Sequence, residues 1–371
     1  MKNYSVILVS PFPPPYGGIA SYSENLYNGL KDKNIDTTIY DTSRFDYLRI
    51  YNPDKKRNYF RIINPLNFVF IIALIFDYFY FFSKIFFKRN LIVHIHTSSF
   101  FGWWRSIIFA FISKLLRKKT ILHVHNAIDR FYYKESGMFG KFLIRISLKI
   151  PDGIISLSHG IKKLLSDITT KPIKAIYNGI HIEEFHPVKK YVKPYKMLFA
   201  GFVGPHKGVP DLLKALKRTK LDSSDIHLTI MGVGDLADMK KIADSIDVRG
   251  MVSFTGRVND EEKIKLFNSH HIFVLPSYGE GQPIAILEGM ASQMAIISTT
   301  VGSIPEIIKK ENGILVDPGD IDGLSKAILT LVGTEHLENI GKKNREIASD
   351  TFSFDRVVHD NIINYDELLK Y

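Results

Sequence analysis

The residues best suited to chemistry are two glutamates, Glu280 and Glu288, in the stretch FVLPSYGEGQPIAILEGMA over residues 273–291. An acidic side chain can fix a ribose by accepting hydrogen bonds from its hydroxyls, as it does in dinucleotide sites. Two glutamates at this spacing are weak evidence by themselves, because a solvated helix face gives the same pattern. The Pro-Ser…Glu-Gly…Pro frame around them is what favours a binding site.

Local signals place this pair at the junction of a strand and a helix. A strand is predicted to end at Pro276 and a helix to begin near Pro283, where the missing N–H of proline loses nothing. The free backbone amides at that helix start would suit a phosphate or a sugar hydroxyl. Glu280 would then lie in the loop, and Glu288 about two helical turns further on.

Strand-like apolar runs alternate with helix-length segments along the whole chain, which predicts an α/β protein with parallel sheets and crossover helices. The expected strands of the first half are Val6–Ser10, Thr37–Asp41, Leu91–His96, Thr120–Asn126, Gly153–Ser158 and Lys174–Asn178. Those of the second half are Met197–Gly201, His227–Met231, Met251–Thr255, Ile272–Pro276, Ala295–Thr299 and Gly313–Val316. The stretch HPVKKYVKP over 186–194 separates the two series and indicates a linker. We therefore predict two doubly wound, Rossmann-like domains, residues 1–188 and 189–353, that face each other across a cleft and bind ligands beyond the carboxyl ends of their strands.

Composition narrows the functional classes. The 371 residues suit two domains, and the absence of cysteine excludes disulfides and thiolate metal sites. No secretory signal is evident, because Met1 leads directly into the strand-like SVILVS, so a cytoplasmic location is expected. The net charge of +11 is uneven: residues 1–188 hold 26 Lys/Arg against 13 Asp/Glu, and residues 189–371 hold 23 against 25. Unless it is a bias of composition alone, the basic first half suggests contact with a polyanion, either anionic lipid or nucleic acid.

Two apolar segments of the basic half are candidates for membrane contact. Residues 65–88 are almost wholly apolar from Phe68 to Phe82, apart from Asp77. A buried crossover helix, a helix that dips one side into a bilayer and a membrane span all remain open, although a central aspartate costs a span roughly 2.5–3.5 kcal/mol. Residues 100–119 combine an aromatic start with a cationic end, which suits either an interfacial helix or a core helix with a solvated terminus. Because both segments lie in the basic half, we expect peripheral attachment to the inner face of the cell membrane.

Histidines and aspartates raise the question of a metal. His125 is expected at the carboxyl end of a strand, on the same face as His123, where it would point into the cleft or serve as a structural histidine. His94 and His96 repeat this spacing, so a histidine metal cluster is conceivable, but no carboxylate accompanies them in sequence. The Asp-Ile-Asp of residues 320–322 resembles a metal-binding Asp-x-Asp motif, yet DPGDIDGLSKAI is better explained as a capped helix start. We expect no divalent metal and no other cofactor.

The run PSYGEGQPIAILEGMASQMAIISTTVGSIPEII resembles the donor-binding core of the retaining GT-B glycosyltransferases of family 4, also called glycosyl transferases group 1. Glu280 and Glu288 fall on that family's E-x7-E pair. Six further motifs resemble those of the family in the same order: PPPYGGIASY, LHVHNA, IYNGIHIEEFHP, LFAGFVGPHKG, IMGVGD and SFTGRV. The resemblance covers essentially the whole chain and implies the GT-B fold, with residues 354–371 as a last helix that packs back on the first domain.

The resemblance also implies the expected catalytic residues. Glu280 would hold hydroxyls of the donor sugar near the reacting face, and Glu288 would bind the ribose. Lys207 would neutralise the donor diphosphate, the leaving group whose charge grows in the transition state. His125 would orient or polarise the attacking hydroxyl of the acceptor. Glu280, Lys207 and His125 are therefore the catalytic candidates.

Other positions are implied to bind the donor. Gly17 and Gly18 would let the backbone approach the phosphates, where a Cβ would clash. The remaining donor-binding candidates are Gly232 in the second donor-domain loop, Arg257 and Val258 beside the base, and Gly281, Gln282 and Pro283 over the sugar and phosphate.

One position departs from the family pattern. Phe202 stands where family members commonly carry an arginine that binds phosphate, and His206 would replace that arginine only in part. A catalytically inactive binding protein is therefore an alternative, weighed against the intact Glu280, Glu288 and Lys207.

The expected function is transfer of a sugar, with retention, from a nucleotide sugar to a lipid-linked or oligosaccharide acceptor in bacterial surface polysaccharide synthesis, such as capsule or O-antigen. The alternatives are a GT-B sugar-nucleotide epimerase or phosphorylase, and a basic nucleic-acid-binding protein. An epimerase needs neither an acceptor nor a membrane-facing half. The basic segments are interleaved with long aliphatic runs instead of forming a basic, aromatic groove, so no nucleic-acid partner is expected.

Overall fold

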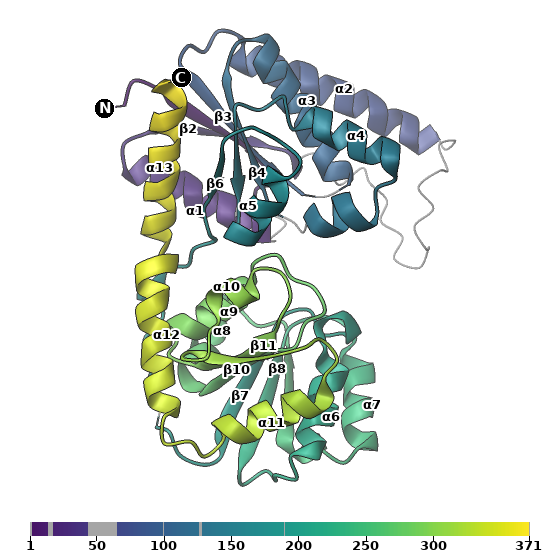
Figure 1. Ribbon diagram of the computed structural model, residues 1–371, viewed down its shortest axis with the longest axis vertical. Helices are drawn as coiled ribbons and strands as arrows, with labels where there is room; N and C mark the ends of the chain where they lie inside the picture. Colours follow the sequence, from purple (N-terminus) through teal and green to yellow (C-terminus); the bar gives the residue numbers. More distant parts are fainter. Residues whose placement is uncertain are drawn as a thin grey trace. The chain divides into compact units, whose positions relative to one another are not determined.

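The structure is a computed structural model that describes residues 2–13, 18–43, 65–98, 100–125, 128–188 and 190–370. The chain divides into two compact units (Figure 1): Met1–Ile176 with Val358–Tyr371 form the first, and Tyr177–Val357 form the second. The predicted linker over 186–194 thus lies inside the second unit.

The described part of the first unit is built on a six-stranded parallel sheet with the strand order β2-β1-β3-β4-β5-β6. Every residue of β3 is buried, as expected of a parallel strand that is covered on both faces. The strands are β1 (Ser5–Ser10), β2 (Asp36–Asp41), β3 (Leu91–Thr97), β4 (Lys119–Val124), β5 (Gly153–Ser156) and β6 (Ile173–Ala175).

The two faces of this sheet are covered by different helices (Figure 1). The chain moves one way from β1 to β2 and the other way from β3 to β6, so right-handed crossovers place the intervening helices on opposite faces. One face is covered by α1 (Gly18–Asp32) and the C-terminal helix α13 (Phe354–Lys370). The other face is covered by α2 (Pro65–Phe86), α3 (Phe101–Leu115), the π-helical turn η2 (Asp129–Lys134), α4 (Met138–Ser147) and α5 (His159–Ser166).

Helix α2 is buried along one side only. Asp77, Phe81 and Ile85, spaced four residues apart, face the core, while Phe76 and Phe79 are 67% and 70% exposed. The helix is thus a crossover element that is buried on its core side and exposed on the other. Among the described residues, no helix combines the length and apolar character needed to cross a membrane.

The second unit is built on another six-stranded parallel sheet in its described part, with the strand order β12-β11-β10-β7-β8-β9. Its strands are β7 (Tyr195–Ala200), β8 (Ile226–Met231), β9 (Val252–Gly256), β10 (Ile272–Leu275), β11 (Ala295–Thr299) and β12 (Gly313–Val316). Its helices are α6 (Val209–Arg218), α7 (Leu236–Ser245), α8 (Asp260–Ser269), α9 (Ile284–Ala291), α10 (Ile304–Ile307), α11 (Ile321–Leu331) and α12 (Leu337–Phe352). Single 3-10 turns form η3 (Ile182–Glu184), η4 (Pro205–Lys207) and η5 (Arg249–Met251).

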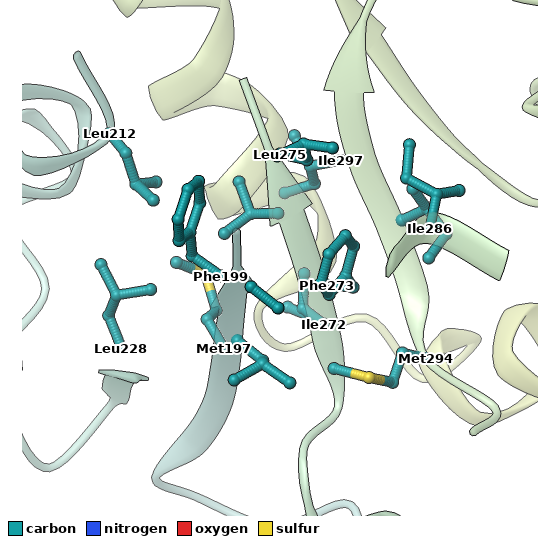
Figure 2. Close-up of a cluster of buried hydrophobic side chains, with 14 of the residues drawn as sticks. Met197, Phe199, Leu212, Leu228, Ile272, Phe273, Leu275, Ile286, Met294 and Ile297 are labelled. Atoms are coloured by element: carbon teal, nitrogen blue, oxygen red, sulfur yellow. The ribbon is translucent and has the colours of Figure 1, made fainter. Parts of the chain in front are cut away.

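An apolar core anchors the two central strands of this sheet. Figure 2 shows Phe199 of β7 and Phe273 of β10 among the side chains of neighbouring strands and helices. Helix α11 packs against α6 on one side of the sheet, and α12 packs against α9 on the other. The loops that follow β7 and β10 are thus carried by strands at the centre of a packed sheet.

The prediction of an α/β fold with two doubly wound parallel sheets is confirmed. All twelve expected strands are present in the described residues, with ends displaced by a few residues. The helix expected near Pro283 begins at Ile284, with Pro283 as its N-cap. Asp320 caps α11 by accepting a hydrogen bond from the Gly323 amide at 2.8 Å, as expected of a helix start.

Candidate functional site

The centre of the second sheet is a topological switch point. Strands β7 and β10 are neighbours, and the chain leaves β7 towards β8 and β10 towards β11, in opposite directions. Doubly wound sheets bind ligands in the crevice that such a divergence leaves at the carboxyl ends of the strands. The motifs GFVGPHKG and SYGEGQP form the two loops at this point.

These two loops are held together by backbone contacts. The Tyr278 amide donates to the His206 carbonyl at 3.1 Å. Gly208 has a φ of 72°, and a Cβ there would lie 2.0 Å from the Pro276 carbonyl oxygen. Only glycine fits both the left-handed conformation and this close approach. The glycine of the HKG motif therefore seats the Lys207 loop on the end of β10.

The seated loop brings together the first two catalytic candidates. The Lys207 ammonium lies 2.5 Å from Glu280 Oε1, and their side chains are 20% and 10% exposed. The two side chains form an ion pair that is largely shielded from water. The Lys207 ammonium therefore lies at the carboxyl edge of the sheet, where it could also contact the phosphate of a ligand.

Glu288 forms a second ion pair, with a residue that the sequence reasoning did not identify. Its Oε1 atom lies 2.9 Å from the Lys263 ammonium of α8. Burial alone would lower the pKa of Lys263, but the Glu288 carboxylate, together with Asp260 and Glu184, outweighs that effect and the pKa is raised. Lys263 therefore stays cationic and holds the Glu288 carboxylate at the inner side of α9.

The loop between the two glutamates is fixed from behind. Gln282 is buried, and its Oε1 atom accepts from the Asn178 amide at 2.5 Å, while its backbone carbonyl accepts from Asn178 Nδ2 at 3.2 Å. The Gly281 carbonyl accepts from both the amide and the hydroxyl of Ser303, at 3.0 and 2.8 Å. The Gln282 side chain is thus committed to the protein interior. Asn178 and Ser303, which position the loop, were not identified from the sequence.

The loops after β8 and β9 join the same edge of the sheet. Gly232 has a φ of 140°, and a Cβ there would lie 1.7 Å from the Gly201 carbonyl oxygen, so only glycine is accommodated. Its amide donates to the Gly256 carbonyl at 2.9 Å. Arg257 follows directly and is exposed, and Val258 is half-buried. These donor-binding candidates therefore lie at the carboxyl edge that also carries Lys207.

Phe202 occupies the position where an arginine was expected. Its side chain is 45% exposed, and its ring lies 5.1 Å from the His206 ring, centroid to centroid. The aromatic side chain supplies no charge to the site.

The first unit holds the remaining candidates. Gly17 lies outside the described residues. Gly18 begins α1 and is exposed, with open space where a Cβ would stand. His125 follows β4 and is 9% exposed, so it is largely buried.

His125 belongs to a cluster of four buried histidines on one face of the sheet. His96 and His123 are in register on β3 and β4, so their side chains point to the same face. The His125 Nε2 atom lies 2.8 Å from His96 Nδ1, and His94 Nε2 lies 3.1 Å from His123 Nδ1. On the far side, His94 Nδ1 lies 2.6 Å from the hydroxyl of Tyr365 in α13.

These histidines are uncharged at neutral pH. Burial lowers the pKa of His94 and of His125 to about 3. The pKa values of His96 and His123 are lowered well below the usual value, first by burial and then by neighbouring histidines. Neutral imidazoles carry one donor and one acceptor each, which suits hydrogen bonding to uncharged groups.

Three of the histidines come close enough to raise the metal question again. One nitrogen from each of His94, His96 and His123 lies within 4.8 Å of the other two. Nitrogens bound to one zinc ion at about 2.0 Å would stand about 3.3 Å apart, and two of these rings already hydrogen-bond each other. The histidine rings are also stacked, His94 on His96 at 4.5 Å, which does not aim their nitrogens at a common point.

Known proteins are similar to both units of the chain. The family model of glycosyl transferases group 1 matches residues 181–347, and that of glycosyltransferase family 4 matches residues 16–184. An uncharacterized glycosyltransferase of Methanocaldococcus jannaschii is 27% identical over 371 residues, 98% of each chain. The O-antigen chain mannosyltransferase RfbU of Salmonella typhimurium is 28% identical over 222 residues, 58% of this chain and 61% of the relative. The capsular polysaccharide biosynthesis glycosyltransferase CapM of Staphylococcus aureus is 26% identical over 250 residues, 61% and 64% of the two chains.

Solved structures share the fold. A glycosyltransferase from Rickettsia africae superposes with a TM-score of 0.76 at 21% identity, over all of both chains. HepE of Anabaena, solved in complex with UDP, superposes with a TM-score of 0.73 at 13% identity, over 98% of this chain and 100% of that one. These neighbours have the GT-B fold, and the fold predicted from the sequence is therefore confirmed.

Proposed function

Because the chain belongs to the family 4, or group 1, glycosyltransferases, we propose that it transfers a sugar with retention from a nucleotide sugar to a lipid-linked glycan in bacterial surface polysaccharide synthesis. The observation that carries the donor half of this proposal is the Lys207–Glu280 ion pair at the switch point of the second sheet. The relatives RfbU and CapM act in O-antigen and capsule synthesis. Anabaena HepE has been solved with UDP and with UDP-glucose.

The proposed chemistry uses the two ends of this ion pair separately. Lys207 neutralises the diphosphate as it leaves, when its negative charge grows, and this kind of stabilisation contributes most in a dry site. Glu280 then accepts hydrogen bonds from hydroxyls of the transferred sugar, and Glu288 accepts those of the ribose. Retention follows from front-face attack, in which the leaving phosphate takes the proton of the acceptor hydroxyl. The proposal needs no divalent metal, because Lys207 supplies the cation.

The test is a panel of nucleotide sugars offered to the purified protein, with thermal shift as the first readout and transfer to a glycan acceptor as the second. We expect one donor to stabilise the protein and Lys207→Ala to remove that stabilisation. A chelator should leave donor binding and turnover unchanged. Donor incubated alone should give no epimer, and an epimerised product would exclude the transferase proposal.

The acceptor half of the proposal rests on an apolar surface of the first unit, which we call the aromatic face. It spans α2, α3 and α4, which lie side by side in Figure 1. Its exposed apolar side chains, in these helices and just after α2, include Ile71, Ile75, Phe76, Phe79, Phe86, Phe87, Trp104, Ile108, Phe111, Leu115, Met138, Phe139, Phe142 and Ile146. Monomeric soluble proteins rarely expose a contiguous apolar surface of this kind without a partner.

Charge favours an anionic lipid surface as that partner. Residues 65–119 contain one acid, Asp77, which is buried. Besides Arg105, which is buried beside Asp77, the same residues contain seven cations, namely Lys84, Lys88, Arg89, Lys114, Arg117, Lys118 and Lys119. An aromatic face bordered by cations binds an anionic membrane interface through both apolar burial and electrostatic attraction. We therefore propose peripheral attachment at the inner face of the cell membrane, where a lipid-linked acceptor is found.

Vesicle sedimentation at low salt tests this attachment. The protein should bind phosphatidylglycerol vesicles and bind phosphatidylcholine vesicles more weakly. Phe79→Glu with Phe111→Glu should weaken binding about tenfold or more, because two aromatic side chains leave the lipid. Leu329→Glu, at a 44% exposed leucine of the second unit, is the matched control and should bind as the unmodified chain does. Equal binding by all three proteins would exclude the aromatic face.

A further inference from the structure

Helices α8 and α9 both begin at the carboxyl edge of the second sheet. The chain crosses the sheet in one direction from β9 through α8 to β10, and in the same direction from β10 through α9 to β11. Right-handed crossovers in one direction place both helices on the same face. Lys263 lies at the end of the first turn of α8 and Glu288 in the second turn of α9, so both residues stand close to this edge.

The start of α8 holds the backbone of Lys263 in place. The Asn259 side chain caps the helix by accepting from the Glu262 amide at 2.8 Å, and the Lys263 amide donates to the Asn259 carbonyl at 2.9 Å. One turn further, Phe267 is fully buried and stacks on Phe273 of β10, with their ring centroids 5.7 Å apart. Residues four apart share a helix face, so Lys263 lies on the same side of α8 as Phe267.

From this fixed position Lys263 reaches one oxygen of Glu288. Its ammonium lies 2.9 Å from Oε1, and the two side chains are 32% and 14% exposed. An ion pair whose lysine is one-third exposed contributes little to folding stability. The pairing is therefore better explained by its effect on Glu288 than by its effect on the fold.

The other oxygen of Glu288 is left open. Within the part of the chain that the structure describes, Oε2 has no hydrogen-bond partner, and it keeps some exposure to solvent. An ionised carboxylate accepts hydrogen bonds on both oxygens. Because Lys263 holds Oε1, the rotation of the carboxylate is restricted, and with it the direction in which Oε2 can accept a hydrogen bond from a ligand.

The charge of Lys263 matters for an anionic ligand as well. Besides Glu288, the carboxylates of Asp260 and Glu184 act on this ammonium, so that one cation faces three acids. Without the cation, these acids would repel a nucleoside diphosphate that approaches the same edge. Loss of Lys263 would therefore lower affinity in general, in addition to any effect on the direction of Oε2.

We propose that Lys263 is a positioning residue of the donor site, which orients Glu288 so that its open oxygen accepts hydrogen bonds from the ribose hydroxyls. The inference rests on the proposed function, in which Glu288 binds the ribose, and adds the residue that gives this contact its direction. Lys263 acts through Glu288 and does not itself contact the donor. Discrimination between ribose and deoxyribose should therefore depend on Lys263, separately from overall affinity.

Ligand pairs that differ by one hydroxyl test this role by isothermal titration on the full chain. The probes are UDP, GDP and ADP, each compared with its 2′-deoxy and 3′-deoxy counterparts. For the nucleotide that binds best, the unmodified chain should prefer the ribose form over at least one deoxy form about tenfold, the usual value of a charged hydrogen bond. Lys263→Met should weaken binding of all forms and reduce the preference to about twofold or less. Lys263→Arg keeps the cation and should keep most of the preference.

A neighbouring lysine provides the matched control. Lys265 is exposed on the same helix, and Lys265→Met should retain both the affinity and the preference. Thermal unfolding of each variant shows whether the chain is folded. If Lys263→Met is not folded, Lys263→Gln removes the charge with a polar side chain, and its preference should fall in the same way.

The outcomes separate this inference from the proposed function. If Lys263→Met lowers the affinity for ribose and deoxyribose forms equally, the lysine contributes only charge, and its positioning role is overturned while the transferase proposal stands. An unchanged affinity and preference in Lys263→Met would overturn it in the same way. If the unmodified chain binds nucleotides without preferring ribose, both the assignment of Glu288 and this inference fail. If it binds no nucleotide, the proposed function fails with them.

Discussion

The carboxyl ends of the two sheets carry opposite kinds of polar side chains. In the second unit the edge is built from two ion pairs, Lys207–Glu280 and Lys263–Glu288. In the first unit it is built from four buried histidines that are neutral. The second unit thus places two ammonium groups at its edge, Lys207 and Lys263, each beside a carboxylate, whereas the histidines of the first unit are uncharged. This is the difference expected if the second unit binds an anionic donor, as we propose, and the first unit does not.

The two kinds of edge also differ in what holds them together. A buried charge is stable only while its partner is present, so each carboxylate of the second unit depends on its lysine. A buried neutral histidine needs no opposite charge, but it resists protonation, because the charged form would lose its hydration. Acid should therefore lower the stability of the first unit. Substitutions that remove a charge should instead disturb the site of the second unit.

The largest expected effect is the acid sensitivity of the first unit. Unfolded histidines have a pKa near 6.5, while His94 and His125 have folded values of about 3. Below pH 6.5 the unfolded chain therefore binds more protons than the folded one, and the free energy of unfolding falls as pH falls. Each histidine contributes up to about 1.4 kcal/mol per pH unit, and the four together up to roughly 5. Stability should be independent of these groups above about pH 7.

Tryptophan fluorescence measures this unit by itself, because both tryptophans of the chain, Trp103 and Trp104, lie in α3. Urea unfolding at pH 7.5 and at 5.5 should show the loss. The double variant His94→Gln with His123→Gln should show about half the slope with pH. His336→Gln, at an exposed histidine of the second unit, should leave the slope unchanged. An unchanged slope in the double variant would mean that the cluster is not the source.

The next effect in size concerns Glu280 in the second unit. Glu280→Gln keeps the shape but removes the charge that Lys207 faces, so we expect turnover to fall about 100-fold. The donor KM should change by only a few fold, because the proposed contacts strengthen in the transition state. Glu311→Gln, at an exposed glutamate, serves as the control. A raised KM with unchanged turnover would move Glu280 from the reacting sugar to simple binding.

A smaller effect is expected at Glu288, and it should appear in nucleotide affinity and not in turnover. Glu288→Gln should weaken nucleotide affinity about tenfold, the usual value of a charged hydrogen bond, with turnover at saturating donor nearly preserved. The contrast with Glu280→Gln is the point of the measurement, since the two glutamates are assigned to ribose and to sugar. Isothermal titration of UDP and GDP provides the affinity. Equal losses of turnover in both variants would contradict the division of roles.

Most of the architecture could be predicted because buried parallel strands leave a plain signal. Runs such as AIIST in β11 and GILV in β12 are apolar, short and bounded by turn residues, and both were placed correctly to the residue. Pro283 and Asp320 mark helix starts through local chemistry that does not depend on the rest of the fold.

Contacts between distant segments could not be predicted in the same way. Lys263 lies in DEEKIKLFNS, where nothing distinguishes it from the other charged residues, and only the packing of α8 against the sheet brings it to Glu288. The sequence showed Asp77 as an acid out of place in an apolar helix, but not that Arg105 and Tyr40 bind it. Such pairings depend on tertiary structure, which a single sequence does not encode locally.

The smallest effect tests how far ligand binding at the carboxyl edge of the second unit's sheet depends on charge. Phe202 is exposed and stands near His206 on the same loop as Lys207, at the position where the sequence resemblance led us to expect an arginine. Phe202→Arg would add a second cation at a solvated position, where such an interaction contributes about 0.4–1 kcal/mol. UDP or GDP should therefore bind roughly two- to fivefold more tightly, and added salt should reduce the gain. Phe202→Leu, which removes the ring without adding charge, should leave affinity unchanged. If the leucine variant weakens binding instead, the ring itself contacts the donor. Binding at the second unit would then depend on apolar contact as well as on charge.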